Sequence, residues 1–114
     1  PAASAEARRV ENRIPGADIN PYLGVAASLV CGYLGMMEKI EPREEYVGEG
    51  YQDRERPLPK ALMDSVDNFT RSKGLRETLG DSFVDTFAAI KRTEYEHRSA
   101  VLSPWDVRFL MTNV

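Results

Sequence analysis

The sequence is poor in the residues that build the commonest disulfide and metal sites. Its 114 residues include one cysteine and one histidine. An internal disulfide is therefore excluded, which favours the reducing cytoplasm as the location. His97 has no cysteine or second histidine near it at metal-ligand spacing, so we interpret it as a surface or helix-end residue. Cys31 lies in an apolar stretch, where a small buried hydrophobe is more typical than a reactive thiol.

Other absences narrow the class of function further. Basic residues are not in excess: 15 Lys and Arg stand against 18 Asp and Glu, a net charge of −3, so we expect no nucleic-acid partner. The sequence contains no Gly-rich phosphate loop, no CxxC pair and no Ser-His-Asp candidate. It also lacks internal repeats and low-complexity tracts. The length suits one domain with its own core.

The most distinctive stretch that is present is short and charged. Residues 7–15 read Ala-Arg-Arg-Val-Glu-Asn-Arg-Ile-Pro. The alternation predicts a strand over about residues 7–14, because successive side chains of a strand point to opposite faces. One face would carry Arg9, Glu11 and Arg13, about 6.6 Å apart, and the other Val10, Asn12 and Ile14.

A row of cation, carboxylate and cation suits a nucleotide triphosphate. Glu11 has the oxygen donors that magnesium prefers. The guanidiniums of Arg9 and Arg13 have the fork geometry that matches phosphate or carboxylate oxygens. The alternative is an exposed Arg-Glu-Arg ladder, which contributes little energy. From spacing alone we favour this ladder, because short charged triplets are common.

The surrounding sequence also resembles a known family. Residues 8–15, followed by Asn-Pro-Tyr-Leu at residues 20–23, resemble the C-terminal signature of the glutamine synthetase catalytic domain. The resemblance extends through residues 79–84, 91–96 and 103–106, and so covers essentially the whole chain. The sequence of residues 12–21 favours the branch of this family that joins glutamate to polyamines or other amines.

The resemblance implies a fold and a set of site residues. The fold class would be α+β, with residues 1–114 forming a mainly helical C-terminal fragment of the catalytic domain that begins with one strand. Glu11 would be a metal ligand for magnesium or manganese. Arg13 would be catalytic, contacting glutamate and the transferring phosphoryl group, and Arg9 and Arg13 would bind ATP. Glu6 stands where many family members have a lysine that helps to hold the nucleotide, so we assign it no role.

The implied activity is an ATP-dependent ligation of glutamate to ammonia or an amine through γ-glutamyl phosphate. The resemblance also implies a cytoplasmic homo-oligomer built as rings, with sites between subunits. The remaining metal ligands would lie upstream of this chain, so we expect the fragment alone to be inactive. The competing hypothesis is a non-catalytic helical interaction module that uses the apolar helix as a partner surface.

That helix is predicted over about residues 21–39. No charge occurs between Ile19 and Met37, and Asn20 and Pro21 suit a helix start. A helix that is apolar nearly all round is typical of burial in a large protein. Its glycines and the lack of basic residues at both ends argue against a membrane span. Gly24, Ser28 and Gly32 form a ridge of small side chains, against which we expect another element to pack.

The remainder of the chain alternates between charged and helical patterns. A charged loop is predicted over about residues 40–57 and helices over about residues 59–112. Gly80 suits the end of one helix, and Asp81 the cap of the next. Ser103, Pro104 and Asp106 have the spacing of an N-cap, a first-turn proline and a capping-box acid.

Overall fold

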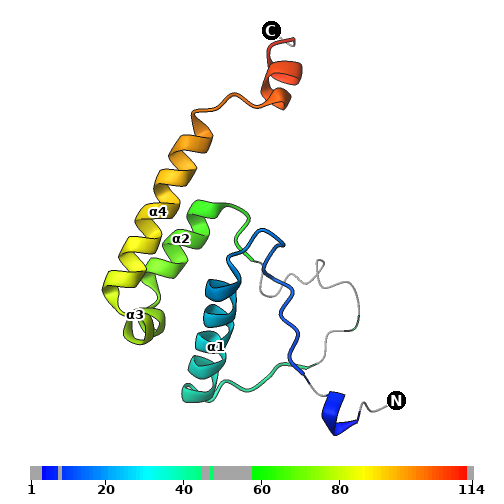
Figure 1. Ribbon diagram of the computed structural model, residues 1–114, viewed down its shortest axis with the longest axis vertical. Helices are drawn as coiled ribbons and strands as arrows, with labels where there is room; N and C mark the ends of the chain where they lie inside the picture. The colour runs from blue at the N-terminus through cyan, green and yellow to red at the C-terminus, as the bar shows by residue number, and fades with distance from the viewer. Residues whose placement is uncertain (1–3, 8, 45–46, 48–57, 113–114) are drawn as a thin grey trace. The chain divides into compact units, whose positions relative to one another are not determined.

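The structure is a computed structural model that describes residues 4–7, 9–44, 47 and 58–112. The chain divides into two units, Pro1–Arg43 and Glu44–Val114. Every regular element in the described part is helical (Figure 1). The first unit contains the 3₁₀ turn η1 (Ala5–Ala7) and α1 (Pro21–Met37). The second contains α2 (Leu62–Arg71), α3 (Lys73–Leu79), α4 (Asp81–Ser99) and the short π-helix η3 (Asp106–Leu110).

The predicted strand over residues 7–14 is wrong, and with it the α+β class for this chain. Ala7 closes η1, residues 9–14 have no regular structure, and Arg8 lies outside the described residues. A strand needs a neighbouring strand for its backbone groups, and the described residues contain none. A local bond forms instead, because the Ile14 N–H donates to Asn12 Oδ1 at 3.1 Å. Of the loop predicted over residues 40–57, residues 45–46 and 48–57 also lie outside the described part.

Helix α1 is closed by local bonds at both ends. At its start, Asn20 Oδ1 accepts from the backbone N–H of Tyr22 at 3.0 Å and of Leu23 at 3.3 Å. At its end, the Ile40 N–H donates to the Gly35 carbonyl at 2.9 Å, which turns the chain back over the last turn. This Schellman geometry places Lys39 at a φ of 50°, a conformation that glycine adopts more easily.

The surface of α1 is apolar and open to solvent. None of its residues is buried, and Tyr22 and Leu29 are 85% and 69% exposed. The burial expected from the sequence is therefore not provided by the described part of the first unit. None of the helices in the described residues is long and apolar enough to cross a bilayer.

The second unit has its own small core. Helix α4 packs against α2 and α3, and α2 and α4 lie side by side in Figure 1. The buried residues are Val66 of α2 with Val84 and Ala88 of α4. Next to them, Phe69 meets Phe87 edge-on at a centroid distance of 5.6 Å, and Phe83 stacks on Phe87 at 6.0 Å. Aromatic pairs in these geometries add to the burial of apolar area.

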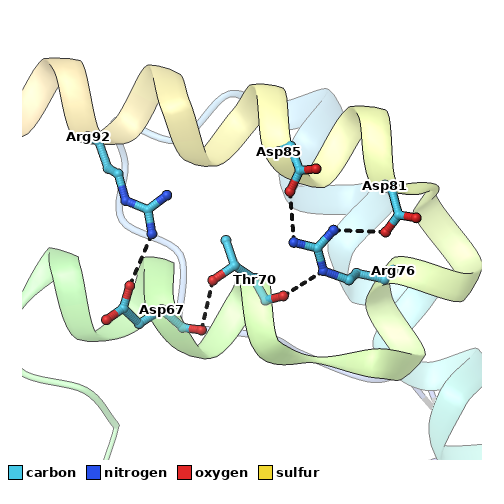
Figure 2. A network of polar contacts seen from close by, with 6 residues as sticks. All are labelled: Asp67, Thr70, Arg76, Asp81, Asp85 and Arg92. Carbon is cyan, nitrogen blue, oxygen red and sulfur yellow. Dashed lines mark hydrogen bonds and ion pairs between the residues drawn. The ribbon is translucent and has the colours of Figure 1, made fainter.

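One arginine joins all three helices of this core (Figure 2). Arg76 of α3 donates from Nε to the Thr70 carbonyl of α2 at 2.6 Å. Its Nη1 and Nη2 donate to Asp81 and Asp85 of α4 at 2.8 and 2.7 Å. The hydrogen bonds to Asp85 and then Asp81 raise the pKa of Arg76 above its ordinary value. A second ion pair, Arg92 to Asp67 at 3.1 Å, links α4 to α2.

Local chemistry fixes two of the junctions in this unit. Gly80 has φ 84° and ψ 144°, a conformation that is strained for other residues. It serves as the N-cap of α4, so Asp81 is the first helical residue and not the cap that the sequence suggested. Before η3, the predicted capping box is confirmed: Ser103 N donates to Asp106 Oδ2 at 2.9 Å, and Asp106 N donates to Ser103 Oγ at 3.1 Å.

The capping box makes η3 sensitive to acid. The hydrogen bonds from the Ser103 hydroxyl and backbone lower the pKa of Asp106. A carboxyl whose pKa is lowered by folding stabilises the folded state above its unfolded-state pKa. This contribution is lost as the pH falls through the lowered pKa of the folded state.

Candidate functional site

The three predicted site residues lie on the irregular segment of residues 9–15, in the first unit. Glu11 and Arg13 form an ion pair, with Arg13 Nε 2.5 Å from Glu11 Oε1. Their side chains are 50% and 84% exposed, respectively. Arg9 is exposed as well, and within the described part of the chain it forms no ion pair with Glu11. The segment therefore presents one paired carboxylate and two guanidiniums to solvent.

Asn12, between the members of this pair, connects the segment to α1. Its Nδ2 donates to Ser28 Oγ at 2.9 Å, and its Oδ1 accepts from the Ile14 N–H at 3.1 Å. The Ser28 hydroxyl in turn donates to the Gly24 carbonyl at 2.9 Å. The segment thus lies along the ridge of small residues, where the sequence indicated that another element would pack.

Between the segment and α1 lies an open groove of about 750 Å³. It is lined mainly by apolar side chains, and the segment contributes Val10, Asn12 and Pro15. The ridge contributes Gly24, Ser28 and Gly32. A Cβ at Gly24 would lie 2.9 Å from Ile19 Cδ1, the end of a side chain that would have to shift.

The charged and the uncharged side chains of the segment differ in whether they line the groove. Val10 and Asn12 line the groove, whereas Arg9, Glu11 and Arg13 do not. The alternation inferred from the sequence thus survives without a strand, except that Ile14 is 71% exposed and is not part of the lining. The charged residues are consequently accessible to a ligand from outside the first unit.

The donor set of this segment is suitable for a metal ion but incomplete. Glu11 supplies hard oxygen atoms of the kind that magnesium and manganese bind. In the part of the chain that the structure describes, no three His, Cys, Asp or Glu residues are grouped to hold a metal. Glu11 is the one carboxylate that residues 9–15 offer to a metal ion.

Sequence reasoning singled out the charged residues but missed the anchor that holds them. Asn12 was placed on the uncharged face, and Ser28 was noted only as a small residue. No pattern within the segment or within α1 indicates that Asn12 and Ser28, 16 positions apart, meet each other. The role of Arg76 is also absent from the sequence analysis, because Asp81 and Asp85 lie five and nine residues further on, in the next helix, and not at the spacing of neighbours on one helix.

Comparison with known protein families shows to which family the chain belongs. The family described as "Glutamine synthetase, catalytic domain" matches residues 1–110. The chain belongs to the glutamine synthetase family. The resemblance drawn from the charged motif and the Asn-Pro-Tyr-Leu stretch is confirmed, because the match covers nearly the whole sequence.

Curated relatives include glutamine synthetases and ligases named for an amine. The chain is similar to a glutamate–isopropylamine ligase from Pseudomonas sp., with 35% identity over 92% of the chain and 24% of the relative. It is 30% identical to the γ-glutamylputrescine synthetase of Escherichia coli, over 99% of the chain and 24% of the relative. It is 31% identical to the glutamine synthetase of Methanosarcina mazei, over 94% of the chain and 26% of the relative.

These relatives are much longer than the region they share with this chain. The chain spans about a quarter of the length of the curated glutamine synthetases and amine ligases that it matches. No solved structure gives a significant match.

Proposed function

We propose that this chain is the C-terminal portion of an ATP-dependent ligase that joins glutamate to ammonia or an amine. The terminal phosphoryl group of ATP passes to the side-chain carboxylate of glutamate, and the nitrogen nucleophile then displaces phosphate from γ-glutamyl phosphate. The observation that carries this proposal is the charged segment of residues 9–15 within a chain that matches the glutamine synthetase catalytic domain over residues 1–110.

Each charged residue of the segment has a separate task in this proposal. Arg13 contacts glutamate and the phosphoryl group during transfer, where a guanidinium can follow the charge on the oxygens. Arg9 lies near the nucleotide phosphates. Glu11 ligates magnesium or manganese. In this structure Glu11 and Arg13 form an ion pair with each other. In the proposal this ion pair is replaced by a contact of Glu11 with the metal and a contact of Arg13 with the phosphoryl group.

A divalent metal, when bound, neutralises phosphate charge and aligns the phosphoryl group for in-line transfer. Glu11 can contribute one ligand through either carboxylate oxygen. The absence of a three-residue ligand group in the described part of the chain supports a site completed by other parts of a longer protein. For the same reason the 114-residue chain alone should be inactive.

The proposed oligomeric assembly and the proposed nitrogen acceptors are those that membership of the family suggests. The protein would be a cytoplasmic homo-oligomer, assembled as rings with sites between subunits. The exposed apolar surface of α1 would then be covered within the complete protein. Relatives named for isopropylamine, γ-glutamylethanolamide and γ-glutamylputrescine stand beside glutamine synthetases among the curated matches. Ammonia and small amines are therefore both candidate acceptors.

The test is a phosphate-release assay on the full-length protein. ATP, glutamate and magnesium are supplied with ammonia, isopropylamine, ethanolamine or putrescine, and each product is identified by mass spectrometry. We expect phosphate release that requires glutamate and one of these acceptors, together with a matching γ-glutamyl product. No release with any acceptor would reject the ligase. The exposed α1 surface would then favour the alternative of a helical interaction module.

The 114-residue chain serves as the second arm of this assay. It should release no phosphate under any of these conditions, because one carboxylate and two guanidiniums cannot build a complete metal site. Turnover by the short chain that depends on an amine would contradict the proposal that the site is shared with other parts of the protein.

A further inference from the structure

The ligase proposal assigns no role to Asn12, whose side chain forms two hydrogen bonds. Asn12 lies between Glu11 and Arg13, and its side chain bonds in two directions. Nδ2 reaches Ser28 Oγ, 16 residues further along the chain, at 2.9 Å. Oδ1 accepts from the Ile14 N–H at 3.1 Å. A single side chain therefore ties α1 to the backbone on the far side of Arg13.

The acceptor on α1 is itself held in place. The Ser28 hydroxyl donates its proton to the Gly24 carbonyl at 2.9 Å, which leaves the oxygen lone pairs to accept from Asn12. Ser28 is half-buried, and Gly24 and Gly32 lie one helical turn before and after it. Neither neighbour has a side chain that would keep the segment away from the helix.

Among the residues that the structure describes, Glu11 and Arg13 have no comparable attachment to α1. Their contact is with each other, and both side chains are largely exposed. Residues 9–14 have no regular structure, so backbone ladders do not fix the direction of these side chains. Within the described part of the chain, the hydrogen bond from Asn12 to Ser28 is consequently the polar contact that holds this part of the segment to α1.

We infer that Asn12 is a positioning residue, which through its hydrogen bond to Ser28 holds the segment bearing Glu11 and Arg13 in register along α1. This inference rests on the proposed function, because the roles of Glu11 and Arg13 give the anchor its catalytic consequence. Catalytic groups must be placed closely, and a displacement of about 1 Å can cost about 10²-fold in rate. Asn12 itself does not need to touch substrate.

The first test measures kcat and the magnesium midpoint of the full-length protein. Asn12→Ala and Ser28→Ala should each lower kcat about three- to ten-fold, the value of one ordinary hydrogen bond, and raise the magnesium midpoint. The double variant should be no worse than either single one, because both changes break the same bond. Ser28→Thr keeps the hydroxyl and should retain activity. Asn68→Ala, at an exposed asparagine of α2, is the matched control and should match the wild type.

The second test does not depend on activity. The Ile14 amide bonds to Asn12 Oδ1, so its hydrogen exchange reports whether the side chain of Asn12 is held. Ser28→Ala should speed the exchange of Ile14 in the full-length protein, although the two residues lie 14 positions apart. Ser28→Thr should leave the exchange unchanged.

The outcomes separate this inference from the proposed function. Unchanged exchange of Ile14 in Ser28→Ala, or kcat losses that multiply in the double variant, would overturn the anchor. An Asn12→Ala protein that behaves like Asn68→Ala would overturn its catalytic role. A wild-type protein without ligase activity would defeat the proposed function and the catalytic role together, while the exchange of Ile14 would still decide the anchor.

Discussion

The two units of the chain differ in the contacts that hold each of them together internally. In the second unit, Val84 is fully buried between helices that Arg76 also joins through three hydrogen bonds. In the first unit, none of the residues of α1 is buried, and the segment beside it is attached by the bonds of Asn12. The second unit contains the contacts of a small helical core. The described residues of the first unit contain an exposed apolar surface on α1 and a charged segment that has no metal-ligand group of three residues.

This difference indicates where stability and chemistry are located. Burial of apolar side chains is the main stabilising term in folding, and the described residues concentrate it in α2 and α4. The candidate catalytic residues lie in the unit with the least burial. Substitutions in the first unit should therefore affect activity with little effect on folding, and substitutions in the second should do the reverse.

The largest expected effect is on catalysis in the first unit. Glu11→Gln keeps the shape of the side chain but removes the charge of the proposed metal ligand, and losing one electrostatic stabiliser costs about 10²–10³ in turnover. The full-length protein should lose turnover by this factor and need more magnesium, while its melting temperature stays unchanged. Glu41→Gln, an exposed carboxylate just beyond α1, is the control. Unchanged turnover and an unchanged magnesium midpoint would remove Glu11 from the site and favour the exposed ladder.

The next effect is on stability in the second unit. Val84→Ala removes two methyl groups from a fully buried position and should destabilise the chain by about 2 kcal/mol. Val25→Ala makes the same change on α1, where the side chain is 62% exposed, and should cost less than about 0.5 kcal/mol. Urea unfolding of both variants measures the contrast. Equal losses would mean that the two units are packed alike.

Arg76 should contribute less to stability than the buried core residues do, and its contribution should depend on the planar geometry of the guanidinium. Arg76→Lys keeps the charge but cannot make all three directed hydrogen bonds, because an ammonium lacks the planar fork. Both Arg76→Lys and Arg76→Met should lower the melting temperature, the latter by about 4–8 °C. If lysine restores the wild-type melting temperature, charge alone explains the contact and the fork does not matter.

The smallest effect concerns the end of α1. Lys39 has a positive φ of 50°, so Lys39→Gly should stabilise the helix end by about 0.5–1 kcal/mol. Lys39→Ala removes the charge but keeps the Cβ, and should give no such gain. Thermal unfolding followed by circular dichroism compares the three proteins. A gain from alanine as large as that from glycine would assign the effect to charge instead of backbone conformation.

Local patterns predicted local structure well in this chain. The cap of α1 at Asn20, the capping box of Ser103 and Asp106 and the helix end at Gly80 all depend on residues a few positions apart, and their bonds are present. Period-two alternation placed Arg9, Glu11 and Arg13 apart from Val10 and Asn12, which line the groove, but it grouped Ile14 with the latter two, and Ile14 is not part of the lining. It could not show whether a partner strand was available, and the predicted strand failed for that reason.

Contacts between distant residues were the part that the sequence did not reveal. Asn12 and Ser28 are 16 positions apart, and Arg92 and Asp67 are 25 apart. No periodicity within one element indicates which residue of another element it will meet. The identities of the site residues came from the family resemblance, and the roles of Arg9, Glu11 and Arg13 remain predictions for the turnover measurements to decide.

The contrast between the two units is tested most directly by hydrogen exchange along the 114-residue chain. Amides exchange slowly where helices are locked by buried contacts, and quickly where a helix lacks them. We predict that the central amides of α2 and α4 are the slowest in the chain, and that those of α1 exchange at least about ten-fold faster. In the full-length protein α1 should become as slow as α4. If α1 is already as protected as α4 in the short chain, the first unit is stable by itself and the contrast between the two units is wrong.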